Sequence, residues 1–427
     1  MSLSARGAAL AGQPGHGLPT EHTFDRDTNP DGLIAPAYAI NIPIKREHFH
    51  FDWPANGGPG LRAALATHFN DNFHPHVPVL PEHIIIGEGA TSIVEILAFA
   101  LMGPGDGVLM SRPAYAGYKK DFAKRANVKI CWVETSAEES LDPQALIAAY
   151  EKALARSHEQ GIAIKAVLIT NPNNPLGRCY PRATQLAIMA FCHAHNLHLI
   201  SDEIFGATEF SSHLSPSPSS PGSTADRTPF TSILSIPQSS TQLSLSRRHV
   251  IYGLAKDFGA PGLRIGALVS QSNPELLSSA HEMLRFHDVS GPSVAIATAM
   301  LEDREWCKAH LDKTRRGLAR AYEHATRGLE ELGIEYVKGG CAGFFVFLDL
   351  SPFLPLVDEG SDLKTQTEEE GPSAAEVALV RKLVDHGLYL APRGESYGKP
   401  GWFRFVFSHE PHVIDEALRR LKKVIAP

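Results

Sequence analysis

The second half of the chain contains the segment Ile251-Tyr-Gly-Leu-Ala-Lys-Asp-Phe-Gly-Ala-Pro-Gly-Leu-Arg-Ile-Gly266. An apolar, strand-like run leads to Lys256, and Arg264 follows eight residues later, after a turn rich in glycine and proline. Burial at the end of a strand disfavours the charged form of a lysine, and a neutral amine can form a Schiff base with an aldehyde. An arginine nearby can hold a phosphate through paired hydrogen bonds. The segment therefore favours a pyridoxal phosphate (PLP) site, although a surface lysine beside an ordinary turn would have the same sequence.

The composition is that of an ordinary globular protein and argues against several functional classes. The length of 427 residues suits a large domain with a smaller one. A net charge of −7 argues against a nucleic-acid surface, and no apolar run reaches the roughly 18 residues of a membrane helix. The five cysteines are widely spaced without a CxxC pair, and the start of the chain lacks the apolar core of a secretory signal. We therefore predict a cytoplasmic protein with neither a disulfide framework nor a zinc site.

The order of apolar runs along the chain predicts an α/β fold. Strands are predicted at 83–86, 107–110, 164–170 and 197–204, and helical patterns separate them. Strands that alternate with helices form parallel sheets, in which ligands bind beyond the carboxyl ends of the strands. The residues that fall at or just past such ends are Thr91, Tyr115, Asn174, Asp202 and Lys256. We expect them to share one site.

Each of these positions can be interpreted as part of a binding site or as an ordinary structural feature. A helix that opens with Gly89-Ala90-Thr91 directs free N–H groups at an anion, or is simply capped there. Tyr115 could stack on a planar ring, and the two prolines beside Asn174 make a rigid turn that presents its amide. His48 and His50 alternate as metal ligands on a strand could, but no third ligand lies nearby, so we predict no metal site.

The rest of the chain divides into predicted domains. We expect an extended N-terminal arm over 1–50 that joins the small domain, a large PLP-binding domain over 51–295 and a small C-terminal α+β domain over 296–427. A run rich in serine, proline and threonine, about 211–246, is predicted to be mostly a flexible surface insertion with a short helix at 230–236. The small domain contains predicted helices at 304–332, 374–387 and 412–425, strands at 343–350 and 401–408, and an acidic loop at about 358–373.

The order of motifs resembles that of the fold-type I PLP-dependent enzymes of aminotransferase class I and II, and within them the 1-aminocyclopropane-1-carboxylate (ACC) synthase-like branch. The resemblance covers nearly the whole chain, and its two long motifs around Asn174 and Lys256 are specific. It implies an α/β fold in which a mostly parallel seven-stranded sheet lies between helices, a small α+β domain, and a homodimer. The motifs are Thr28-Asn-Pro-Asp-Gly-Leu33, Gly89-Ala-Thr91, Pro113-Ala-Tyr115, Asn171-Pro-Asn-Asn-Pro-Leu-Gly177, Ser201-Asp-Glu-Ile204, Lys256-Asp-Phe-Gly-Ala-Pro-Gly-Leu-Arg264 and Pro400-Gly-Trp-Phe-Arg404.

The resemblance also implies a role for each residue. Lys256 would hold PLP as a Schiff base and shuttle a proton at the substrate Cα, and Arg404 would clamp the substrate carboxylate. Asp202 would keep the ring nitrogen protonated. The remaining cofactor contacts would be Asn174 and the residue at 205 at the ring hydroxyl, Tyr115 on the ring face, and Ala90, Thr91 and Arg264 at the phosphate.

Several family positions are altered in this chain. Phe205 replaces a tyrosine whose phenol would bond the ring oxygen, and Ile40 replaces a glutamate at the substrate position of ACC synthases. Hydroxyl groups that reach the phosphate in relatives are also missing, at Gly253, Ala255 and, by alignment, Phe51. Since a hydrogen bond to a charged group contributes about 1.5–3 kcal/mol, we expect weaker PLP retention, a changed reaction, or both.

The expected function is that of an aminotransferase in specialised metabolism that acts on an amino acid or an amino-acid-derived substrate. The alternative is a PLP-dependent lyase or cyclase of the ACC synthase-like type, including one that cleaves a C–S bond of a cysteinyl adduct. A non-catalytic PLP-fold protein is a third reading. No nucleic acid or membrane is expected as a partner, and the sequence does not select the substrate side chain.

Overall fold

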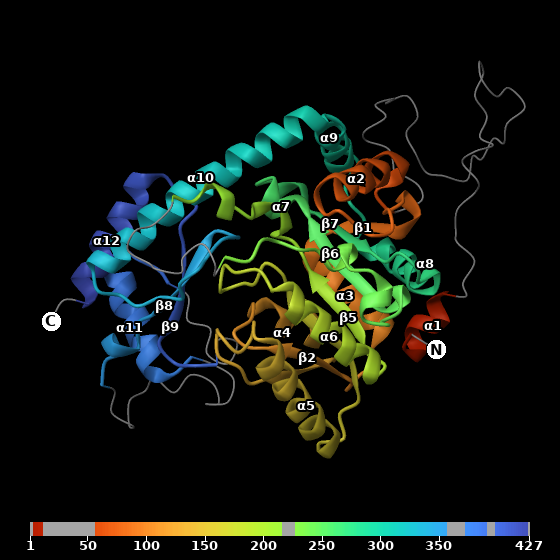
Figure 1. The fold of residues 1–427 in the computed structure, drawn as a ribbon, viewed down its shortest axis with the longest axis horizontal. Coiled ribbons are helices and arrows are strands. Elements are labelled where there is room, and N and C mark those ends of the chain that lie inside the picture. Colours follow the sequence, from red (N-terminus) through yellow and green to blue (C-terminus); the bar gives the residue numbers. More distant parts are fainter. Residues whose placement is uncertain (1–2, 12–55, 216–226, 357–371, 391–397, 426–427) are drawn as a thin grey trace, which may run out of the picture.

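The computed structural model describes residues 3–11, 56–215, 227–356, 372–390 and 398–425 (Figure 1). Its central feature is a seven-stranded sheet with the order β1-β7-β6-β5-β4-β2-β3. Strand β7 is antiparallel to both of its neighbours, and the other pairs are parallel. The predicted, mostly parallel sheet is therefore confirmed. The strands are β1 (Ile84–Glu88), β2 (Gly107–Ser111), β3 (Lys129–Val133), β4 (Ile164–Thr170), β5 (His198–Asp202), β6 (Arg248–Gly253) and β7 (Ile265–Val269).

Helices pack on both faces of this sheet because its strands are apolar on both sides. In β6, for example, Val250 and Tyr252 face one core cluster and Ile251 faces the other. The first cluster includes residues of α2 (Gly58–Asn72), α5 (Pro143–Glu159), α6 (Arg182–Ala194) and α9 (Gly291–Glu302). The second includes residues of α3 (Gly89–Leu101), α4 (Gly117–Ala123) and α8 (Pro274–Met283).

The topology places the carboxyl ends of six strands at one edge of the sheet. Because β7 is antiparallel to β1 and to β6, β1 has the same direction as β6. Strands β3 and β7 were not among those predicted from the sequence. Lys256 was expected at or just past a strand end; β6 ends at Gly253, and Lys256 lies just beyond it in the short helix α7 (Leu254–Asp257). The chain then turns back into β7, so Lys256 and Arg264 lie between two antiparallel strands.

The N-terminal segment differs from the extended arm that we predicted. Residues 5–11 form helix α1 (Ala5–Ala11), which packs on α8 and α3. The composition explains the helix, because alanine and leucine favour it. The guanidinium of Arg6 donates to the carbonyls of Phe99, Met102 and Ala126 at the end of α3 and beyond it. The rest of the predicted arm, including His48 and His50, lies outside the described residues, as does Phe51 of the predicted large domain.

The segment predicted as a flexible insertion is in part a core element. In its described portion the side chains of Ile233, Leu234 and Ile236 are buried in the main core. Buried Glu203 lies beneath this segment, where its carboxylate accepts hydrogen bonds from Ser232 Oγ at 2.5 Å and from Ile233 N at 2.9 Å. The prediction rested on the average composition of the run, which is dominated by serine, proline and threonine, and it therefore overlooked these apolar residues. Residues 216–226 lie outside the described part.

Replacement of Glu203 by alanine is expected to destabilise the protein by about 3–4 kcal/mol, because Ser232, Ile233 N and Ser201 would lose their buried acceptor. Burial raises the pKa of Glu203 from 4.5 to about 7. The folded state therefore binds this proton more tightly than the unfolded state, and the group's contribution to stability falls as the pH rises through this window. Urea unfolding at pH 5 and pH 8 measures both effects. Ser201→Ala, which removes one donor, should cost about 1 kcal/mol, and an equal loss in both variants would contradict this account.

A second, two-stranded sheet lies across from the first, and the long helix α10 (Arg304–Glu331) connects the two regions (Figure 1). Its strands β8 (Phe345–Asp349) and β9 (Trp402–Val406) are antiparallel, with Phe347 opposite Arg404. Val346, Leu348, Phe403 and Phe405 face a core that they share with α10, α11 (Ala374–Asp385) and α12 (Pro411–Ile425). The other face of the small sheet, which carries Phe345 and Arg404, is directed toward the large sheet. The division at residue 295 stays a prediction.

None of the helices in the described ranges combines the length and the apolar character that crossing a bilayer requires.

Candidate active site

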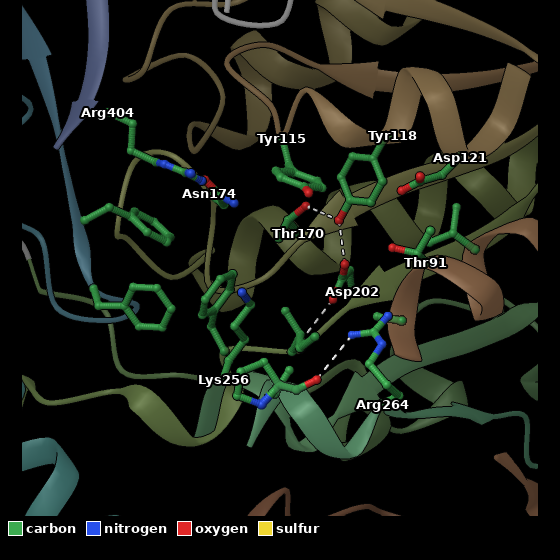
Figure 2. Close-up of a pocket in the computed structure, with 18 residues that line it drawn as sticks. Thr91, Tyr115, Tyr118, Asp121, Thr170, Asn174, Asp202, Lys256, Arg264 and Arg404 are labelled. Carbon is green, nitrogen blue, oxygen red and sulfur yellow. Dashed lines mark hydrogen bonds between the residues drawn. The ribbon is translucent and has the colours of Figure 1, made fainter. Parts of the chain in front are cut away.

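A cavity of ≈ 320 Å³ lies between the carboxyl edge of the large sheet and the open face of the small one (Figure 2). It brings together residues from eight separate segments of the chain. The sequence-predicted residues that line it are Ala90, Thr91, Tyr115, Asn174, Asp202, Phe205, Lys256, Arg264 and Arg404. Ile40, the remaining predicted contact, lies outside the described residues.

The amine of Lys256 is half-buried in this cavity. Burial lowers its pKa, the charges of Arg404 and Arg264 lower it further, and Asp202 acts in the opposite direction. The Nζ atom lies 5.7 Å from the centre of the Phe344 ring. The site therefore favours the neutral amine, which is the nucleophilic form.

Asp202 ends β5 as a buried carboxylate with spare acceptor capacity. Its Oδ2 accepts a hydrogen bond from Tyr118 Oη at 2.6 Å, and its Oδ1 accepts one from the Ile204 N–H at 3.1 Å. Burial raises the pKa of Asp202 to about 6 against these hydrogen bonds and the Lys256 charge. Within the described ranges, no cationic side chain forms an ion pair with it. A buried carboxylate of this kind fits a cationic N–H group of a ligand.

Tyr118 and Asp121 line the cavity as well, and neither was predicted from the sequence as a site residue. They lie three and six residues after Tyr115, and this spacing places them on one side of α4 (Figure 2). Tyr118 Oη also contacts Thr170 Oγ1 at 2.9 Å, and burial raises the tyrosine's pKa, so it stays a neutral donor to Asp202. Burial raises the pKa of Asp121 to about 6, with Asp202 as the second cause.

One corner of the cavity is suited to an anion. Helix α3 begins at Gly89, which has a φ of 76°, and its first N–H groups lack intrahelical partners. A Cβ atom on Gly89 would lie 2.6 Å from Nη2 of Arg264, and one on Gly266 of β7 would lie 2.2 Å from the Gly89 carbonyl carbon. Glycine at both positions therefore lets the helix terminus, the strand and the guanidinium meet beside Thr91.

The opposite wall carries a second cation. Arg404 projects from β9, and its Nη1 donates to Asn174 Oδ1 at 2.9 Å (Figure 2). Its guanidinium carbon lies 5.5 Å from the centre of the Phe345 ring. The hydrogen bond thus joins the turn after β4 to the small sheet. Tyr115, 39% exposed, stands edge-on to Tyr118 with ring centres 5.3 Å apart.

The altered family positions have different structural settings. Gly253 has no room for a side chain, because a Cβ atom there would lie 2.6 Å from the Ile265 carbonyl oxygen. Ala255 lines the cavity and leaves space where a hydroxyl could stand. Phe205 is buried against Phe344 and Phe345. The missing hydroxyl at 253 is therefore a consequence of close strand pairing.

Comparison with known proteins agrees with this geometry. A sequence profile described as Aminotransferase class I and II matches residues 46–421. A Leptosphaeria maculans protein named probable aminotransferase sirI is 34% identical over 402 residues, which cover 94% of this chain and 88% of that protein. A 1-aminocyclopropane-1-carboxylate synthase of Glycine max is 32% identical over 406 residues, covering 93% and 76%. The aromatic aminotransferase structure from Pyrococcus horikoshii OT3 shares the fold, with a TM-score of 0.68, 20% identity and coverage of 88% and 87%.

Proposed function

The chain belongs to the aminotransferase class I and II family, and on this basis we propose that it is a PLP-dependent aminotransferase that acts on an amino acid bound between Lys256 and Arg404. The resemblance predicted from the motifs is confirmed at the family level. The observation that carries the proposal is that Lys256, Asp202 and the anion corner line one cavity. A role in specialised metabolism stays a prediction.

The donor set of the cavity fits PLP. Lys256 offers an amine of lowered pKa for the aldehyde, Asp202 a buried acceptor for the ring nitrogen, and the α3 terminus with Arg264 an anion corner for the phosphate. Asn174 and Tyr115 would contact the ring oxygen and the ring face. When bound, PLP supplies an electron-withdrawing ring that stabilises negative charge at the substrate Cα.

The protein's own groups would perform the remaining work. Arg404, held by Asn174, would bind the substrate carboxylate and thereby orient the Cα–H bond. Lys256 Nζ would accept the proton from Cα and return it to a neighbouring carbon, because burial and the neighbouring arginines lower its pKa and so shift it toward the proton-accepting amine. Asp202, with Tyr118 donating to it, would hold a proton at the ring nitrogen.

A panel of amino acids added to the PLP-loaded protein tests the proposal. Transamination converts PLP into pyridoxamine phosphate, with a characteristic absorbance change, and releases one keto acid per cofactor. A protein that binds PLP yet converts none of the amino acids would overturn the proposed function.

A lyase or cyclase reaction is the second candidate, because ACC synthases are among the relatives above 30% identity. The same panel separates the two. Elimination releases ammonia, thiol or keto acid while PLP is regenerated, and cyclisation releases no keto acid. Accumulation of pyridoxamine phosphate would favour transamination.

We also propose that the protein acts as a homodimer, as this family typically does. Phe286, which is 74% exposed, ends the short turn 284–286 that precedes α9, and Ile296, which is 55% exposed, lies in α9. Such apolar exposure favours burial against another chain. Light scattering should give about twice the chain mass of 46.4 kDa, and a monomer with full activity would overturn this.

Replacement of Asp121 by asparagine is expected to tighten PLP binding at pH 8 by about three- to tenfold and to leave it unchanged at pH 5. The pKa of about 6 means that Asp121 is ionised above this pH, and its charge then repels a phosphate in the same cavity. Neighbouring charges also face it, Asp202 and Glu95 from other elements and Lys120 from its own.

Affinities for PLP and for inorganic phosphate between pH 5 and pH 8 test this prediction. The ratio between variant and wild type removes the titration of the phosphate itself. Glu302→Gln, at an exposed acid outside the cavity, serves as the control. Weaker binding by the Asp121→Asn variant at pH 8 would contradict the prediction.

A further inference from the structure

Three phenylalanines line the cavity beside the amine of Lys256 and the guanidinium of Arg404. Phe344 lies against the amine, with 5.7 Å between Nζ and its ring centre, and Phe345 lies against the guanidinium, at 5.5 Å. Phe205 packs edge-on against both, with ring centres 5.4 Å and 5.3 Å away. We call these three residues the aromatic wall. It joins the segment after β5 to the start of β8.

The proposed function places the substrate's nitrogen at Lys256 and its carboxylate at Arg404, and the following step rests on that proposal. Both groups are bonded to the same Cα atom, so Cα must lie between these two side chains. Its side chain then meets the aromatic wall. We infer that Phe205, Phe344 and Phe345 receive the side chain of the substrate, and that the substrate class is α-amino acids with a large apolar or aromatic side chain.

The charges in the cavity support this class over dicarboxylic amino acids. Among the described lining residues the cations are Lys256, Arg264 and Arg404. Arg404 would hold the α-carboxylate, Lys256 would lie beside Cα as the proposed base, and Arg264 lies over Gly89 in the anion corner. Among the described residues, a second carboxylate would therefore have no further cation beside it, and it would lose its hydration against the rings. An aromatic side chain would instead gain edge-to-face contacts.

Phe344 is the residue of the wall most open to a ligand. Phe205 and Phe345 are 3% and 2% exposed and support it from behind, whereas Phe344 is half-buried and lines the cavity. Its neighbour Gly343, with a φ of 68°, leads the chain into β8. We therefore assign Phe344 as the residue that determines side-chain specificity.

Unreactive carboxylates provide a test that does not depend on turnover. The PLP-loaded protein is titrated with 3-phenylpropionate and with succinate, and cofactor absorbance reports binding. We expect 3-phenylpropionate to bind at least about tenfold tighter, and Phe344→Ala to reduce this preference about tenfold. Phe344→Leu, which keeps most of the volume, should retain a preference for an apolar ligand but lose part of the aromatic advantage. Phe353→Ala, in the small domain outside the cavity, should bind as wild type does.

The outcomes separate the two proposals. Equal or tighter binding of succinate, or an unchanged preference in Phe344→Ala, would overturn the assigned substrate class while the amino-acid panel still reports transamination. Reaction with aspartate or glutamate faster than with phenylalanine would overturn it as well. A panel in which no amino acid reacts would instead overturn the proposed function, and this inference with it.

Discussion

Lys256→Ala is expected to lose covalent attachment of the cofactor and to lower turnover by at least about 10⁴-fold. Among the described residues, Lys256 is the lysine that lines the cavity, and its lowered pKa supports the proposed role as nucleophile and base. Borohydride treatment of the wild-type protein, followed by peptide mass analysis, should place a pyridoxyl group on the peptide that contains Lys256. Stopped-flow absorbance with a reactive amino acid measures the loss of rate.

Two control variants sharpen this result. Lys256→Arg keeps a cation in the cavity but cannot act as a nucleophile, and it should lose as much activity as the alanine variant. Lys120→Ala removes an exposed lysine of the neighbouring helix α4 and should leave the rate unchanged. Full turnover by either Lys256 variant, or labelling of another lysine, would show that the attachment site lies elsewhere.

Asp202→Asn is expected to lower turnover by about 10²–10³-fold. The asparagine can still accept from the Ile204 N–H, but it carries no charge to hold a proton at the ring nitrogen. Steady-state rates with one amino acid and one keto acid measure the effect. Tyr118→Phe removes only the donor to Asp202 and should lower turnover by a smaller factor.

The stability of the same variant separates chemistry from folding. The pKa of Asp202 is raised from 3.8 to about 6 by burial, so the folded state binds its proton more tightly than the unfolded state. Stability from this group therefore falls as the pH rises through that window. Above pH 6 the cofactor-free Asp202→Asn protein should unfold no more easily than wild type. A variant that is both unstable and inactive would leave Asp202 a structural role only, contrary to our proposal.

The parts of the fold that could be predicted from sequence are those with a strong local pattern. The strand at 164–170 is an apolar run bounded by breaking residues, and the structure has the same bounds. The convergence of Thr91, Asn174 and Asp202 needed one further rule, that ligands bind at the carboxyl ends of parallel strands. The structure does bring these residues to one cavity.

The features that escaped prediction depend on distant contacts. Tyr118 has no local mark of function, and its importance comes from a carboxylate 84 positions later in the chain. Strand β7 follows the lysine turn so closely that it was read as part of one motif. The buried residues around Ile233 lie in a serine-rich run. Their place in the core depends on a hydrogen bond from the Ile233 N–H to Glu203, which is distant in the sequence. In each of these cases the observed structure depends on tertiary contacts that the local sequence does not show.

The close approach of Gly89 to Gly266 has a consequence for how such a protein can change over generations. At Gly266 even one added methyl group would collide with the backbone of Gly89, so this backbone contact beside the phosphate site tolerates almost no variation. Arg404 belongs to the other sheet and Phe344 directly precedes its strand β8, and both line the cavity through their side chains. Mutations are therefore more easily accepted in the substrate half of the cavity, so that a lineage can acquire new substrates while it keeps one cofactor.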